Sequence, residues 1–179
     1  GEAASLTTEA IAELMVGRPL AGLRARDPRP PGVALLEVRG LEAHDDRRFP
    51  ALRGVSLAVA GGEILGIAGI EGNGQRELAE CIAGLRPHLR GEIVIAGRHM
   101  SGRTAREHFA AGLAHIPSDR LRDGLVPGMS LAENLALGRH HEPALGKGPF
   151  LSHRAMGARA ATLLAEYDVR PPSPGLLAA

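Results

Sequence analysis

A glycine-rich stretch, residues 66–78, has the residue types and spacing of a loop that holds phosphate. It reads GIAGIEGNGQREL, with Gly69, Gly72 and Gly74 between an apolar run and a helix-like segment. Glycine permits positive φ angles and close approach of a ligand to the backbone. Successive backbone N–H groups in such a turn form an anion-binding nest, and the following helix N-terminus adds partial positive charge. The spacing therefore predicts the backbone geometry of a phosphate site.

The side chains that normally complete such a loop are replaced. The pattern G-x-x-x-x-G-K-[ST] runs from Gly69 to Gly74 and then expects Lys and Ser or Thr, but the sequence has Gln75 and Arg76. Gln75 donates hydrogen bonds but brings no charge to the phosphates. Arg76 suits a phosphate contact, yet it repels the Mg²⁺ that a hydroxyl would bind. Two interpretations stay open: an altered nucleotide site, or three glycines that only form a sharp strand-to-helix turn.

The elements around the loop are predicted from their hydrophobic patterns. Residues 35–40 and 55–59 alternate like half-buried strands. Residues 64–69 form a continuous apolar run, typical of a strand buried on both faces in a parallel sheet. Residues 75–85 have a helical pattern. The side chains expected to face inward from this helix are Leu78, Cys81, Ile82 and Leu85.

The second half of the chain continues with strands and helices. Residues 91–97 and 113–117 are strand-like, and residues 146–149 read as a loop. A last helix is predicted over 153–167. Its inward side chains are expected to be Met156, Ala160, Leu163 and Leu164.

Two capping boxes predict where helices begin. Thr104 and Glu107 are spaced so that each side chain bonds the other's backbone N–H, which predicts a short helix that ends near residue 111. Ser130 and Glu133 have the same spacing and predict a second helix start.

The composition of the chain argues against several classes of function. The net charge is +1, aromatic residues make up 2%, and no basic stripe with interleaved aromatics indicates a nucleic-acid partner. The single cysteine, Cys81, excludes an internal disulfide and a cysteine-based metal site. His140 and His141 are adjacent rather than spaced i, i+4, so no metal site is predicted. We find no signal-peptide pattern and no apolar segment of spanning length, so a membrane role would come through a partner.

The first 32 residues differ from the rest. A short helix is expected over 8–16, followed by the proline-rich stretch RARDPRPPG at 24–32, which reads as a linker. From Val33 onward the sequence contains the strand, loop and helix that open a nucleotide-binding α/β fold. No later apolar strand ends in Asp or Glu. We therefore expect the chain to be a portion of a larger protein.

The order of three stretches resembles one family. They read VSLAVAGGEILGIAGIEGNGQREL, GEIVIAG and GLAHIPSDRLRDGLVPGMSLAENLAL. The chain resembles the ATP-binding proteins of bacterial ABC importers, and more narrowly the second nucleotide-binding module of the tandem ATPases that energise uptake of simple sugars or nucleosides. The resemblance implies a P-loop NTPase (RecA-like) α/β core with an antiparallel β-subdomain and part of a helical subdomain. It also implies three parts: 1–23 as the C-terminal tail of the preceding module, 24–32 as linker, and 33–179 as the front portion of the second module.

The resemblance assigns site residues position by position. Ser118, which would be the Q-loop residue, stands where the family has Gln or Glu; it is followed by Asp119 and Arg120. Phe49 is the candidate for stacking on adenine, with local packing as its alternative. No catalytic residue and no metal ligand is assigned. The implied nucleotide-binding residues are Gly69, Glu71, Gly72, Asn73, Gly74, Gln75, Arg76 and Glu77.

The resemblance also implies partners. ATP is the expected ligand, with Mg²⁺ in the intact protein. The expected partners are the first ABC module of the same chain, transmembrane permease subunits and, indirectly, a substrate-binding protein, at the cytoplasmic face of the bacterial inner membrane. The signature motif, the Walker B carboxylate and the switch His are expected beyond residue 179, so this piece alone is not expected to hydrolyse ATP. The alternatives are a dimerisation half that binds no nucleotide and an unrelated P-loop enzyme such as a kinase.

Overall fold

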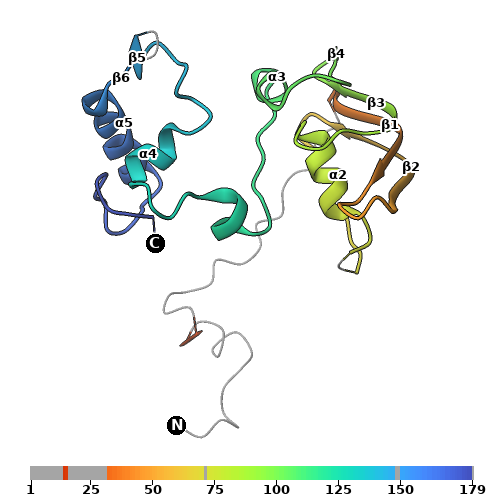
Figure 1. The fold of residues 1–179 in the computed structure, drawn as a ribbon, viewed down its shortest axis with the longest axis horizontal. Helices are drawn as coiled ribbons and strands as arrows, with labels where there is room; N and C mark the ends of the chain where they lie inside the picture. Colours follow the sequence, from red (N-terminus) through yellow and green to blue (C-terminus); the bar gives the residue numbers. More distant parts are fainter. Residues whose placement is uncertain (1–13, 16–31, 71, 148–149, 179) are drawn as a thin grey trace, which may run out of the picture.

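The computed structural model describes residues 14–15, 32–70, 72–147 and 150–178 (Figure 1). Figure 1 shows a sheet with helix α2 beside it at one end and the helix pair α4 and α5 at the other. The stretch between α3 and α4 joins the two ends. Both ends are built mainly from elements close together in the sequence.

The sheet is antiparallel throughout, in the order β2-β1-β3-β4. Its strands are β1 (Ala34–His44), β2 (Pro50–Ala60), β3 (Arg90–Ile95) and β4 (Arg98–His99). β1 lies in the middle of the first three, and Glu37 faces Ala58 of β2 on one side and Val94 of β3 on the other. The predicted strands at 35–40, 55–59 and 91–97 are confirmed. The first two strands are longer than the alternating segments that predicted them.

Helix α2 (Gln75–Ile82) covers one face of this sheet and confirms the helix predicted after the glycine loop. Leu78 and Cys81 are buried against sheet residues, in a cluster that also contains Leu41 and Ile93. Burying each such aliphatic side chain stabilises the fold by about 1.5 to 3 kcal/mol. The helix ends earlier than predicted, and Leu85 is exposed rather than inward.

Both predicted capping boxes form. Thr104 and Glu107 begin α3 (Ala105–Ala110), with both reciprocal bonds present. Ser130 and Glu133 begin α4 (Leu131–Ala136) in the same way. Each box satisfies backbone N–H groups that lack partners in the first turn of a helix.

The C-terminal end packs α4 against α5 (His153–Glu166). Ala136, Leu145 and Met156 form a second, smaller buried cluster. The inward positions predicted for α5 are buried at Met156, Ala160 and Leu164 and half-buried at Leu163. The expected loop at 146–149 contains instead half of a hairpin, β5 (Gly146–Lys147) paired with β6 (Phe150–Leu151).

Two strand predictions are wrong. Residues 64–69 and 113–117 are extended but form no strand. The run at 64–70 is exposed throughout, with Ile64 87% exposed. A strand buried on both faces needs a neighbour on each side to pair its backbone, and within the described residues nothing pairs with either run.

The first part of the chain is described only at two positions. Leu14 and Met15 are helical, and the rest of the helix predicted over 8–16 lies outside the described residues. The linker at 24–32 lies outside them too except for Gly32, whose N–H donates to the carbonyl of Gly61. None of the described helices has both the length and the apolar character needed to cross a bilayer.

Candidate functional site

Two glycines of the loop have the backbone conformation that its sequence predicts. Gly72 and Gly74 have φ angles of 87° and 94°, in the left-handed region that favours glycine. Gly74 is the N-cap of α2, and its carbonyl accepts the N–H of Leu78 at 2.9 Å. A Cβ on Gly74 would lie 2.7 Å from the carbonyl oxygen of Ala51. The end of the loop therefore packs directly on β2 and tolerates no side chain there.

Gln75 folds back across the loop. Its Nε2 donates to the carbonyl of Ile70 at 3.2 Å. A Cβ on Gly69 would overlap this amide, so the Gln75 side chain lies directly on the Gly69 backbone. The position of the expected lysine is thus filled by a neutral group that bonds the loop itself.

Arg76 belongs to a chain of ion pairs. Its Nε lies 2.7 Å from Glu80, and the other oxygen of Glu80 lies 2.7 Å from Nε of Arg86. Arg86 also contacts Asp46 at 2.6 Å and donates to the carbonyl of His44 at 3.0 Å. Because Glu80 holds Arg76, a phosphate would have to share this guanidinium with a carboxylate.

The charged groups of this chain stabilise one another's ionised forms. The hydrogen bond and the positive charge from Arg86 lower the pKa of Asp46. Burial opposes ionisation of Glu80, but hydrogen bonds from Arg86 and Arg76 outweigh it and lower the pKa of Glu80 as well. Burial likewise opposes the charge on Arg86, yet its bonds to Asp46 and Glu80 raise the pKa of its guanidinium. The network stays charged across the neutral pH range.

An open cavity of about 1260 Å³ joins the glycine loop to the predicted Q-loop. The charged lining residues missed by the sequence reasoning are Glu80, Arg86, Arg122 and Asp123. The charged run SDRLRD was the signal for the last two, but it reads equally as a solvated surface. The predicted site residues that line the cavity are Gly69, Gly72, Gly74, Gln75, Arg76, Glu77 and Ser118.

The other predicted site residues lie elsewhere. Asn73, Asp119, Arg120 and Phe49 are not among the residues that line the cavity, and Glu71 lies outside the described residues. Their nucleotide contacts stay predictions.

The Q-loop segment is shaped by an aspartate cap. Oδ1 of Asp119 accepts the backbone N–H groups of Leu121 and Arg122 at 3.0 and 3.1 Å. This cap begins the π-helical turn η2 (Arg120–Gly124). Asp119 therefore acts here on the backbone, while Ser118 is exposed and lines the cavity together with Arg122 and Asp123.

Phe49 lies in the turn between β1 and β2. The Asp45 carboxylate accepts the N–H groups of Arg47 and Phe49 at 2.9 and 2.8 Å, which fixes the turn. The ring is 65% exposed, so it contributes little to local packing and is free to meet a ligand.

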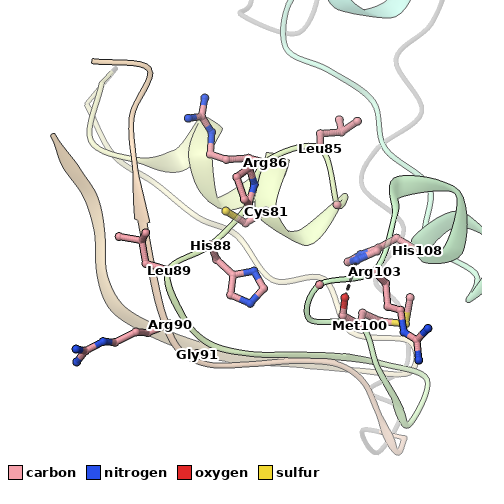
Figure 2. A pocket seen from close by; sticks show the side chains of 13 residues that line it. Cys81, Leu85, Arg86, His88, Leu89, Arg90, Gly91, Met100, Arg103 and His108 are labelled. Atoms are coloured by element: carbon pink, nitrogen blue, oxygen red, sulfur yellow. Dashed lines mark hydrogen bonds between the residues drawn. The ribbon is translucent and has the colours of Figure 1, made fainter. Parts of the chain in front are cut away.

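A second cavity, of about 510 Å³, lies at the other end of α2 (Figure 2). It contains Cys81 and His108, and burial raises the pKa of the Cys81 thiol to about 11. The ring nitrogens of His108 face the carbonyls of Ile82 and Met100 at 2.8 and 3.1 Å, and the ring is 2% exposed. These contacts hold α3 against the end of α2 and the residue that follows β4. The protonated thiol is a packing group rather than a nucleophile.

No metal centre is formed by the residues that the structure describes, since they contain no cluster of three His, Cys, Asp or Glu side chains able to hold an ion.

Known proteins similar to this chain come from one group. A family model described as ABC transporter matches residues 52–173. The nucleoside import ATP-binding protein NupA of Lactococcus lactis subsp. cremoris is 37% identical over 164 residues, which cover 92% of this chain and 32% of that protein. A glucose import ATP-binding protein of Haloferax volcanii is 39% identical over 160 residues, which cover 89% of this chain and 29% of that protein. The chain thus spans about a third of the length of these relatives.

The fold comparison agrees. A nucleotide-free ATP-binding cassette from an ABC transporter superposes with a TM-score of 0.63 at 19% identity, covering 82% of this chain and 58% of that one. With the family match across most of its length, this chain belongs to the ABC transporter family, as part of an ATP-binding cassette with the P-loop NTPase fold.

Proposed function

We propose that this chain is part of the ATP-binding subunit of an importer for simple sugars or nucleosides, and that its glycine loop binds nucleotide weakly without supporting hydrolysis. The observation that carries the proposal is the cavity that brings the glycine loop and Ser118 together. The names of the relatives, which describe nucleoside and glucose import ATP-binding proteins, support the transport role.

The altered side chains explain why hydrolysis is not expected at this loop. Phosphoryl transfer needs charge neutralisation on the phosphates, a positioned water and Mg²⁺. Gln75 brings no charge and bonds Ile70, and Arg76 is paired with Glu80. Ser118 is too short to reach a metal except through water. The loop keeps the backbone cradle and loses the groups that drive the chemistry.

The proposal extends to the organisation of the whole protein. We propose that residues 33–179 are the front portion of a second ABC module, that residues 1–23 end a first module, and that 24–32 link the two. The partners would be that first module, permease subunits in the bacterial inner membrane and, through them, a substrate-binding protein. ATP with Mg²⁺ would then be hydrolysed at the companion site, with this subunit at the cytoplasmic face.

Calorimetric titration with ATP tests the binding step. We expect weak saturable heat, and little change when Mg²⁺ is removed, because Arg76 stands where the Ser or Thr hydroxyl that binds the ion would be. In the intact two-module protein, disabling the loop of the first module should abolish turnover. Robust remaining turnover would contradict the proposal.

A second candidate is a dimerisation half that binds no nucleotide. The contact between Gln75 and Ile70 favours it, because the loop is then closed by its own side chain. The same titration separates the two: absence of heat at millimolar ATP, with no competition against a fluorescent nucleotide, favours the scaffold.

A further inference from the structure

The chain of ion pairs links two places that one nucleotide would touch. It begins at Arg76 in the first turn of α2 and passes through Glu80 to Arg86. From Arg86 it reaches Asp46, in the turn between β1 and β2, at 2.6 Å. This turn also carries Phe49. Four charged side chains therefore connect the end of the glycine loop to the turn that carries the exposed aromatic ring.

A separate contact places the same two features side by side. A Cβ on Gly74 would meet the Ala51 carbonyl at 2.7 Å, so the end of the glycine loop lies against β2 at this residue. Ala51 follows Phe49 by two positions, and a chain extends at most about 3.6 Å per residue. The backbone of Phe49 thus lies within about two residues' length of the point where the glycine loop meets β2.

The ion pair between Arg86 and Asp46 joins a largely buried side chain to an exposed one. The side chain of Arg86 is 13% exposed and has three partners in place, whereas that of Asp46 is 69% exposed. Figure 2 shows the guanidinium of Arg86 directed away from His88 and Arg90. Exposed ion pairs contribute little to stability. The contact to Asp46 is therefore better suited to setting the position of the turn than to holding the fold together.

We propose that Arg86 is a positioning residue for nucleotide recognition. Through Asp46 it holds the β1–β2 turn against α2, so that the Phe49 ring and the glycine loop stand at a fixed separation for the base and the phosphates of one nucleotide. The proposal rests on the proposed function, since it needs the loop to bind nucleotide. It adds a role for two residues, 40 positions apart, that no phosphate-loop pattern contains.

The test compares a ligand that has a base with one that has none. ATP and inorganic tripolyphosphate are titrated into the full chain by calorimetry at matched Mg²⁺, with and without Asp46→Asn. Stacking of a base on an aromatic ring is worth enough that its partial loss should weaken ATP binding roughly fivefold. Binding of tripolyphosphate should change less than about twofold, because the glycine loop itself is untouched.

Asp168→Asn is the matched control. Asp168 is also an exposed aspartate paired with an arginine, Arg170, at 2.9 Å, with a side chain 75% exposed, and it lies outside the site. It should change neither affinity. Far-UV circular dichroism and the unfolding midpoint show that each variant keeps the fold.

Phe49→Ala shows whether Asp46 acts through the ring. In the Phe49→Ala background, Asp46→Asn should have no further effect on ATP affinity, since the ring it positions is gone. Equal weakening of ATP and tripolyphosphate, or additive effects of the two substitutions, would overturn the positioning role while leaving nucleotide binding in place. If the unchanged chain binds neither ligand, the proposed function itself is wrong and the positioning role is overturned with it.

Discussion

The four-stranded sheet and the two apolar runs at 64–69 and 113–117 have similar residue types and opposite surroundings. In the sheet, Leu41 and Ile93 are fully buried. In the runs, Ile64 and Ile116 are among the most exposed of the described residues, although Leu113 of the second run packs partly buried against the sheet core. Antiparallel strands obtain their partners through short hairpins, whereas a parallel strand needs partners delivered by long crossovers. The difference shows that apolar sequence alone does not bury a segment; paired neighbours do.

The largest expected effect tests this contrast directly. Ile93→Ala should lower the free energy of unfolding by about 3 kcal/mol, because it removes buried methylenes and leaves a cavity in the core. Ile64→Ala removes the same atoms from an exposed position and should change it by less than about 0.5 kcal/mol. Urea denaturation of both variants measures the difference. Equal losses would mean that the run at 64–69 is buried in solution and that the contrast is wrong.

The next effect is at the boundary between the regions, where the glycine loop meets β2. Gly74→Ala should cost about 3 kcal/mol, because it forces a left-handed φ and drives a Cβ into the Ala51 carbonyl. Gly72→Ala has the same kind of φ but open space around it, and should cost about 1 kcal/mol. Thermal unfolding compares the two. If both cost the same, the close approach between loop and sheet is absent.

Much of the sheet region could be predicted because its determinants are local. The alternation at 35–40 and 55–59, the three glycines and both capping boxes specify their own geometry within a few residues. Spacing and resemblance also singled out the glycines and Ser118, which line one cavity in the fold, and their nucleotide contacts stay predictions. These features need no knowledge of distant partners.

The remaining features depend on distant contacts. Arg86 and Asp46 are 40 positions apart, and neither lies in a recognisable motif, so their contact appears only in the fold. The strand predictions at 64–69 and 113–117 failed for the same reason, since pairing partners are a property of the whole arrangement. The exposure of Leu85 follows from the end of α2 at Ile82, where the helical pattern of the sequence continued.

A third, smaller effect tests whether water reaches the core beneath α2. Burial raises the pKa of the Cys81 thiol from an ordinary value of 9.0 to about 11. Between these values the unfolded chain has lost the thiol proton that the folded chain retains. The stability that the group contributes is complete below pH 9 and is lost as pH rises through 11, by up to about 2 kcal/mol.

Denaturation at a series of alkaline pH values measures this loss. Cys81→Ala carries no thiol, so its stability should fall less steeply over the same range, whatever its stability at neutral pH. Parallel curves for the two proteins would show that the thiol is hydrated and that the core under α2 is open to water.

The smallest expected effects are at the two capping boxes, which lie on either side of the stretch between α3 and α4. Thr104→Ala and Ser130→Ala each remove the side chain that accepts the N–H of the third helical residue, and each should cost about 1 kcal/mol. Thr162→Ala is the control, because this exposed threonine in α5 bonds only the carbonyl of Ala158 within its own helix, and its loss should be neutral. Circular dichroism during urea denaturation measures all three.

If the two ends of the molecule unfold together, both cap variants shift one common transition. If α4 and α5 unfold separately from the sheet, Ser130→Ala shifts only an early transition, since the cluster of Ala136, Leu145 and Met156 is much smaller than the core beneath α2.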